Sequence, residues 1–300
     1  MIFLSVFTKK LTLILFILMC IQCSHAQEDV VKSVISLIDS KEYKKAESKL
    51  KAELLRKENE ELIELLGDVY GHQRKWTEAK NEYKKLVEKD PENANYQYKY
   101  GGVLGMMALN NKLKGLVLID DVKRAFTKAV VLDPEHINVR WALVELYIQL
   151  PGFVGGSVKK AEFYAEELGQ IKPIEGLLAK GYIADYEKKE DEAANYYKQA
   201  MEYIHTINEE YPRNNINYQI GKIAANYRIN LNEGLIHLNR FIKNHSSSDN
   251  VSLDWIYYQM ARIFRHKKDK NNALINIEKA LAIRSDFKEA VKEKKQIEKL

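Results

Sequence analysis

Residues 60–93 read EELIELLGDVYGHQRKWTEAKNEYKKLVEKDPEN, and this stretch decides the fold. Its apolar and small residues recur at helical spacing in two groups, Ile63, Leu66, Gly67 and Tyr70, then Trp76, Ala79, Tyr83 and Leu86. A polar turn at 71–75 separates the two groups, and Pro91 ends the second one because proline disfavours helix at the residue before it. The stretch therefore predicts a hairpin of two amphipathic helices, in which the small residues Gly67 and Ala79 allow close contact.

The hairpin pattern is repeated along the rest of the chain. Gly101 follows Gly67 by 34 residues, and Gly181, Gly221 and Ala261 take the same place in later copies. One helical hairpin cannot bury its apolar face alone, so we expect the copies to stack. The expected units are 27–59, 60–93, 94–136, 137–173, 174–213, 214–250 and 251–287, followed by a capping helix at 288–300.

The order Leu66-Gly67, Tyr70, Trp76, Ala79, Tyr83 and Pro91 resembles the tetratricopeptide repeat. This resemblance implies an all-α fold, a tetratricopeptide-type α-solenoid of about seven helical hairpins wound into one right-handed superhelix over residues 27–300. Residues 121–168 are similar to a group of exported bacterial tetratricopeptide proteins that share a Pro-Gly-x-x-Gly-Gly-Ser segment, here at 151–157. That second resemblance implies the fold and export, and it implies no defined activity.

Two units carry extra residues. The segment 106–118 is rich in Leu, Met and Gly, and we expect a lengthened helix or an apolar loop there. In the segment 151–157, the glycines permit positive φ and Ser157 can cap the next helix. A phosphate-binding loop is a poor interpretation of these glycines, because neither a preceding strand nor a following Gly-Lys-Ser/Thr is present. In the fifth unit we expect the second helix to run on through Ile207 to Pro212.

The amino terminus predicts export. Two lysines, Lys9 and Lys10, precede an apolar run at 11–21, and Ser24-His25-Ala26 supplies small residues at a signal peptidase site. We therefore expect residues 1–26 to be a signal peptide and the mature chain to begin at Gln27, in the periplasm or at the cell surface. The apolar run is short for a membrane span. An uncleaved anchor and a lipoprotein acylated at Cys20 or Cys23 stay open as alternatives.

Composition argues against most catalytic chemistry. The only two cysteines lie in the expected signal peptide, so the mature chain would have neither thiolate catalysis nor a cysteine metal site. No two histidines lie four residues apart, and no nucleophile motif of the Gly-x-Ser-x-Gly type is present. The net charge of +5 is spread over alternating lysines and glutamates rather than gathered in a basic stripe with aromatics. We expect no enzyme activity, no cofactor, no metal and no nucleic-acid partner.

What remains is the surface. In tetratricopeptide proteins the first helix of each unit lines a concave groove, and this resemblance assigns groove positions to the present chain. Counting from each unit's start, the assigned residues form an aromatic row with flanking charges: Tyr98, Trp141, Glu145, Tyr182, Tyr218, Lys222, Tyr258 and Arg262. Such aromatics either pack in the core or contact a ligand. Rigid rings in a groove favour an extended peptide or a partner helix.

Two functions from different classes follow. The leading hypothesis is a non-enzymatic scaffold that binds another envelope protein or a peptide through its concave groove. The alternative is an accessory protein that binds cell-envelope glycan or peptidoglycan, because aromatic grooves also stack on sugar faces. The chain lacks the charge pattern of chaperone-binding tetratricopeptide domains, since Lys222 and Asn226 have its spacing but stand alone.

Overall fold

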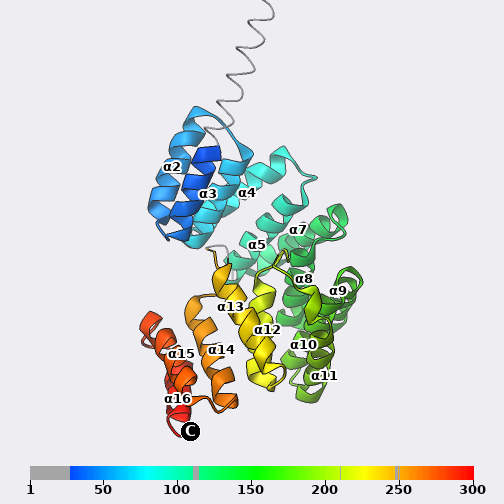
Figure 1. Cartoon of the computed structure of the whole chain (residues 1–300). Helices are drawn as coiled ribbons and strands as arrows, with labels where there is room; N and C mark the ends of the chain where they lie inside the picture. The colour runs from blue at the N-terminus through cyan, green and yellow to red at the C-terminus, as the bar shows by residue number, and fades with distance from the viewer. Residues whose placement is uncertain (1–27, 111–114, 210, 247–248, 250) are drawn as a thin grey trace, which may run out of the picture. The chain divides into compact units, whose positions relative to one another are not determined.

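The structure is a computed structural model that describes residues 28–110, 115–209, 211–246, 249 and 251–300 (Figure 1). The expected signal peptide and its two cysteines lie outside the described residues. Every regular element in the described part of the chain is helical. The chain divides into two compact units, Met1–Lys112 and Leu113–Leu300.

The first unit consists of consecutive helices joined by short turns. Residues 28–39 are helical, and the labelled helices that follow are α2 (Tyr43–Arg56), α3 (Glu60–His72), α4 (Trp76–Lys89) and α5 (Ala94–Asn110). The deciding stretch thus forms the hairpin α3–α4. Asn59 begins α3 by accepting a hydrogen bond from the amide of Leu62, at 3.0 Å. The first five residues of the 106–118 segment form the end of α5, so the helix is lengthened there, and positions 111–114 lie outside the described residues.

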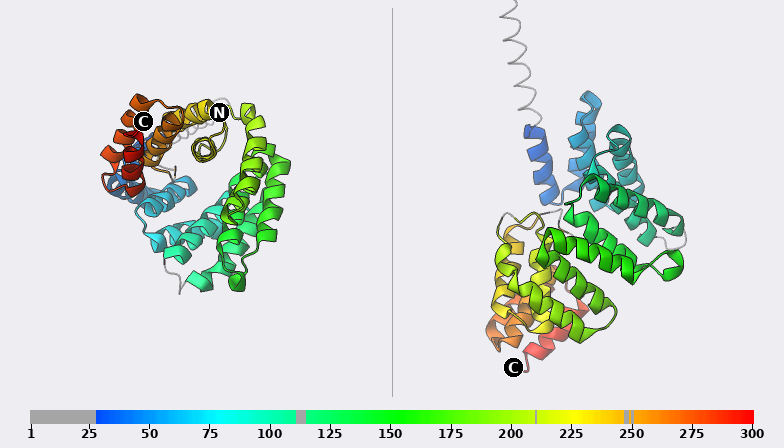
Figure 2. Two further views of the ribbon diagram at one scale, coloured as in Figure 1. Left: turned by 90° about the horizontal axis from the view of Figure 1, so that it is seen from below. Right: turned by 90° about the vertical axis from the view of Figure 1, so that its right-hand side faces the viewer.

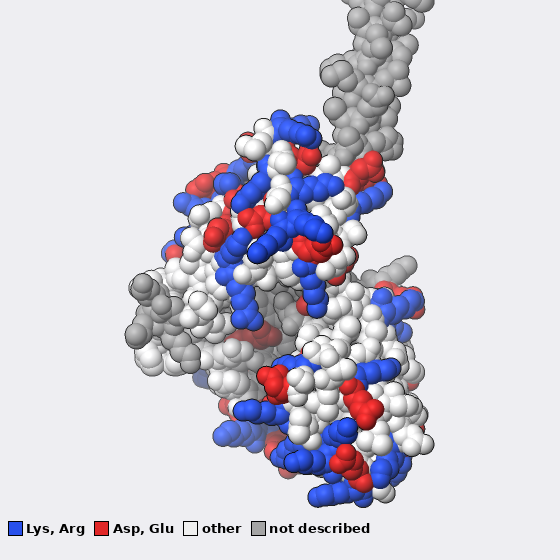
Figure 3. All heavy atoms as spheres, turned by 90° about the vertical axis from the view of Figure 1, so that its left-hand side faces the viewer, with Lys and Arg blue, Asp and Glu red and all other residues white. Residues whose placement is uncertain are grey.

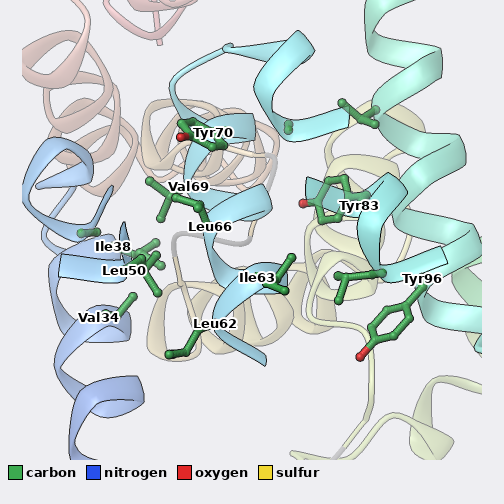
Figure 4. Packing of buried hydrophobic residues seen from close by; sticks show 14 residues of the cluster. Val34, Ile38, Leu50, Leu62, Ile63, Leu66, Val69, Tyr70, Tyr83 and Tyr96 are labelled. Atoms are coloured by element: carbon green, nitrogen blue, oxygen red, sulfur yellow. The ribbon is translucent and has the colours of Figure 1, made fainter. Parts of the chain in front are cut away.

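The core of the first unit lies between successive helices (Figure 4). Val34 and Leu50 are fully buried where the first two helices meet, and Leu66 and Tyr83 are buried between α3 and α4. The alternation of these apolar positions with solvated lysines and glutamates is what makes each helix amphipathic. On the face that Figure 3 shows, lysines and arginines are interspersed with aspartates and glutamates.

At Gly67 the helices α3 and α4 are in close contact. A Cβ added to Gly67 would lie 2.6 Å from the ring of Tyr83, and that ring is fixed because its hydroxyl donates to Asp68 Oδ1 at 2.6 Å. We expect Gly67→Ala to lower the free energy of unfolding by about 1–3 kcal/mol through overpacking. The measurement is urea unfolding followed by circular dichroism.

Gly71 provides the matched control for this prediction. It lies one turn further along α3, and a Cβ added there would meet nothing within 4 Å. Since alanine has a helix propensity about 1 kcal/mol better than glycine, Gly71→Ala should leave stability unchanged or raise it slightly. Equal effects of the two substitutions would contradict the assigned packing of α3 on α4.

The second unit continues the same architecture. After η1 (Leu116–Leu118) come α7 (Ile119–Leu132), α8 (Ile137–Gln149), η2 (Gly152–Val154), α9 (Val158–Ile171), α10 (Pro173–Tyr186), α11 (Glu190–Glu202), η3 (Ile204–Thr206), α12 (Asn215–Tyr227), α13 (Leu231–Lys243), α14 (Leu253–His266), α15 (Lys270–Ile283) and α16 (Lys288–Ile297). Helices pack in pairs, α8 with α9, α10 with α11, α12 with α13 and α14 with α15 (Figure 2). The first helices of neighbouring pairs also touch, α8 with α10 and α12 with α14.

The glycine-rich segment 151–157 is a short connection between α8 and α9. Gly155 has φ +88°, which a residue with a side chain rarely adopts, and Ser157 caps α9 by accepting from the amide of Lys160 at 3.3 Å. Lys123 on α7 donates to the carbonyl oxygen of Val154 at 2.9 Å. The segment is therefore fixed to the neighbouring helix by its backbone.

The sequence predicted that the second helix of the fifth repeat, 174–213, continues to Pro212, and this prediction is wrong. Helix α11 ends at Glu202, and η3 and an extended residue, Ile207, follow before α12 begins. The side chain of Ile207 is buried, and its carbonyl oxygen accepts from Arg240 at 2.8 Å. Tertiary contacts with α13 thus replace the helical continuation that the local sequence favours.

The carboxyl-terminal helix covers the last hairpin of the second unit. Ala290 and Ile297 on α16 are fully buried together with Ala261, Ile277 and Phe287. Arg265 on α14 donates to Glu293 on α16 at 2.5 Å. A terminal helix with a charged outer side closes the apolar end of the stack.

Candidate functional site

Four helices of the second unit present equivalent positions on one side. On α8, α10, α12 and α14 a buried residue faces the paired second helix; Gly181, for example, lies so near Tyr197 that an added Cβ would be 2.3 Å from the ring. The next residue along each helix is turned about 100° away from that contact. These next residues are Glu145, Tyr182, Lys222 and Arg262, and we call them the first-helix face.

The members of the first-helix face differ in what they contact. Glu145 and Lys222 are exposed to solvent, and neither forms an ion pair with any residue that the structure describes. Tyr182 is half-buried, and its hydroxyl accepts from Gln149 at 3.1 Å. Arg262 donates to Gln259 Oε1 at 3.0 Å and also to the side chain of Asn226. The face therefore combines an acid, a phenol and two bases whose charges the fold itself does not neutralise.

Two further tyrosines of the predicted row lie deeper, against the second helices and the end of the stack. Tyr218 packs on Phe241 with ring centroids 6.2 Å apart, and burial raises its pKa. Tyr258 lies 5.2 Å from the ring of Phe287 and 5.5 Å from the guanidinium of Arg262, and burial raises its pKa as well. Both residues are half-buried, so each packs within its hairpin and keeps part of its surface exposed to solvent.

Tyr98, the remaining aromatic of the predicted row, is on α5 in the first unit and is half-buried. In the first unit, Asp68 on α3 occupies the position that Glu145 has on α8. Its charge is already compensated, because Lys99 donates to both of its oxygens at 2.8 Å. The candidate site therefore lies in the second unit.

Trp141 lies in the interior rather than on the surface. Only 6% of the residue is exposed, and its indole Nε1 donates to Glu175 Oε2 at 2.7 Å. Its ring lies 6.3 Å from that of Tyr182 and 5.0 Å from the guanidinium of Arg213. Trp141 thus packs against Tyr182 in the interior and is not part of the exposed surface.

Glu175 is the centre of a buried polar network that the sequence analysis did not identify. Its carboxylate accepts from Trp141, from the hydroxyl of Tyr211 at 3.0 Å, and from Arg213 through Nε at 3.1 Å and through Nη2. Burial raises the pKa of Tyr211, and the nearby Glu175 carboxylate raises it further. The helical spacing could have indicated that Glu175 is buried, because it lies four residues before Ala179 and therefore on the same buried side of α10.

Two open clefts of the second unit lie away from the first-helix face. One has a volume of about 510 Å³ and is lined by α9, α10 and α11, with Gly169, Gly176 and Lys180 among its residues. The other, of about 600 Å³, lies beside Pro134, Arg140 and Glu167. Neither cleft includes a residue of the predicted row. In the described part of the chain, no three histidine, cysteine or acidic side chains gather in a way that could hold a metal ion.

None of the described helices has both the length and the apolar character that a membrane span requires. Two segments match sequence models of the tetratricopeptide repeat, residues 64–93 and residues 256–287. The chain therefore contains tetratricopeptide repeats, and its fold is a tetratricopeptide-type α-solenoid. Proteins with this fold generally act as non-catalytic scaffolds for protein–protein interaction.

Solved structures resemble the chain at low identity. The Cut9–Hcn1 hetero-tetramer structure includes a chain that is 19% identical with a TM-score of 0.53, over 88% of this chain and 48% of that one. A tetratricopeptide repeat protein from Parabacteroides merdae is 13% identical with a TM-score of 0.49, over 90% of this chain and 98% of that one. No curated protein matches the sequence. At these identities the likeness concerns the fold alone.

Proposed function

We propose that this chain is a non-enzymatic scaffold that binds another protein, or a peptide segment of one, through the first-helix face of its second unit. The observation that carries the proposal is the row Glu145, Tyr182, Lys222 and Arg262 at equivalent positions on four successive first helices. Charges that the fold does not pair, beside a half-buried ring, favour recognition of a complementary partner. The fold supports the proposal, since the structure of similar fold named above is a complex of Cut9 with Hcn1.

Glycan binding is the second candidate, and the geometry favours it less. A sugar-binding platform needs aromatic faces that are open to solvent, whereas the rings of Tyr218 and Tyr258 pack against Phe241 and Phe287. Capture of a glycan by the first-helix face would therefore contradict the scaffold function.

We also propose that the protein acts outside the cytoplasm, in the periplasm or at the cell surface, with another envelope protein as its partner. This location rests on Lys9 and Lys10, the apolar run at 11–21 and the small residues before Gln27. A lipid anchor at Cys20 or Cys23 is the competing form.

Site-specific photocrosslinking in the native host tests both proposals. A photoreactive amino acid is placed at Lys222 in one variant and at Lys198, an exposed residue of α11, in the control. We expect a protein adduct from position 222 and none from position 198, and intact mass of the purified chain should show a start at Gln27. Adducts from position 198 alone, or a glycan adduct from position 222, would contradict the proposed function. An acyl group on the purified chain would contradict the start at Gln27 and support the lipid-anchored alternative.

A further inference from the structure

Arg262 is held in place without being neutralised. Its guanidinium donates to the side-chain oxygens of Gln259 and Asn226, and both of these acceptors are uncharged amides. Gln259 is itself buried, which fixes the first of these contacts. An arginine bound by a carboxylate would have its charge compensated inside the fold. Neutral acceptors instead orient the side chain and leave its positive charge available to a partner.

Lys222 adds a second positive charge on the neighbouring helix. It lies one turn before Asn226 on α12, is exposed, and forms no ion pair with a described residue. His266 on α14 lies among several of the positive side chains. Burial lowers the pKa of His266, and Arg265, Arg228 and Arg262 lower it further, against a hydrogen bond with the carbonyl oxygen of Ala225. Arg265 is paired with an acid, Glu293, whereas Arg228 and Arg262 form no ion pair with a residue that the structure describes.

The other end of the same face has the opposite sign. Glu145 on α8 is exposed and has no ion-pair partner among the described residues. Even so, the surrounding protein desolvates the carboxyl enough to raise its pKa, whereas Arg213 acts in the opposite direction. Arg213 is itself paired with Glu175, so its charge is already compensated. Burial raises the pKa of the adjacent Tyr182, and Glu145 contributes to that increase.

We infer that the first-helix face is electrically polarised and holds an extended peptide segment whose charges run in the opposite order. A basic side chain of the partner lies against Glu145 on α8, and an acidic side chain lies against Lys222 and Arg262 on α12 and α14. Tyr182 lies between the two ends and contacts an apolar part of the segment. This inference rests on the proposed function and adds to it the chemistry and the alignment of the partner.

Such an arrangement selects a partner by alignment as well as by affinity. A segment that is shifted by one hairpin, or laid in the reverse charge order, places like charges against each other, and like-charge contacts disfavour binding. The uncompensated charges of Glu145, Lys222 and Arg262 thus determine which partner binds and in which alignment, and they need not stabilise the fold.

Two photoreactive probe peptides test the inference on the purified chain at low ionic strength. One peptide is rich in glutamate and the other is rich in lysine, and mass spectrometry locates each labelled site. We expect the acidic probe to label α12 and α14 and the basic probe to label α8 and α10. Labelling should fall as salt is added, because exposed charges are screened.

Charge reversal provides the decisive comparison. Lys222→Glu with Arg262→Glu should reduce labelling of α12 and α14 by the acidic probe about tenfold, since two attractive contacts become repulsive. The control, Lys198→Glu with Lys292→Glu, makes the same change in net charge at exposed positions of α11 and α16 and should leave that labelling unchanged. Glu145→Lys should move the basic probe away from α8 in the same way.

The outcomes separate this inference from the proposed function. Equal effects of the two double reversals, labelling of the wrong end, or no labelling by either probe would overturn the polarised face. If a native protein still crosslinks to position 222 in that case, the scaffold function stands and only the charge rule fails. If neither variant of the native crosslinking experiment captures a protein, the function itself fails, whatever the probes do.

Discussion

Glu175→Ala is expected to lower the free energy of unfolding of the second unit by about 3–5 kcal/mol. Glu175 is fully buried, and it accepts hydrogen bonds from Trp141, Tyr211 and Arg213. The alanine variant would leave the guanidinium of Arg213 buried without a counter-charge and two further donors without an acceptor. Removing one member of a buried ion pair costs more than the intact pair contributes, because the partner's desolvation is no longer compensated.

Urea unfolding of the purified chain measures this effect, and Glu166→Ala serves as the control. Glu166 is on α9 in the same unit and is also paired with a lysine, Lys180, at 3.7 Å, but its side chain is 65% exposed. An exposed pair of this kind contributes about 0–1 kcal/mol. Comparable losses from Glu166→Ala and Glu175→Ala would contradict the buried network. A Glu175→Gln variant should lose more stability than Glu166→Ala and less than Glu175→Ala, since glutamine keeps the shape of the side chain and loses its charge.

Trp141→Ala is expected to cost about 3–5 kcal/mol of stability through the cavity left in the interior. The indole is buried against Tyr182 and Arg213, and its N–H is bonded to Glu175. Trp141→Phe keeps most of the apolar contact and loses only the donor, so it should cost about 1–3 kcal/mol. Thermal or urea unfolding of both variants provides the measurement.

This prediction also separates two interpretations of the aromatic row. A residue that contacts a partner can be truncated with little loss of stability, whereas an interior residue cannot. Near-normal stability of Trp141→Ala would therefore return Trp141 to the surface, against the structure. A double-mutant cycle of Trp141→Phe with Glu175→Gln should show coupling, since the two side chains share one hydrogen bond.

The fold could be predicted because the signals that define it are local. The period of Ile63, Leu66 and Tyr70 requires only a few neighbouring residues, and the turn before Trp76 and the proline at 91 mark where helices end. These signals led to an all-α solenoid of tetratricopeptide type, which the helical elements and the repeat matches confirm. The positions of Glu145, Tyr182, Lys222 and Arg262 relative to each other also follow from repetition, because equivalent residues of stacked hairpins lie on one side.

What each of those residues contacts was decided by the tertiary structure. Trp141 and Tyr182 are both aromatic members of one periodic row, yet one is buried and the other is half-exposed. The difference comes from Tyr211 and Arg213, which lie in an irregular connection and contact a helix more than 30 residues earlier in the chain. No periodic pattern describes such a connection, and α11 ends at Glu202 for the same reason, because burial of Ile207 outweighs local helix preference.

Apart from the end of α11, the sequence by itself therefore determined where the helices lie, how they pair, and which positions share a side of the stack, since each of these depends on spacing within about one repeat. The tertiary structure alone decided which charges are compensated: Glu175 by Arg213, and Asp68 by Lys99, while Arg262 has only neutral partners. Charge compensation depends on groups that the packing of neighbouring helices and connections brings together, and the free energy of pairing two charges falls steeply once water separates them.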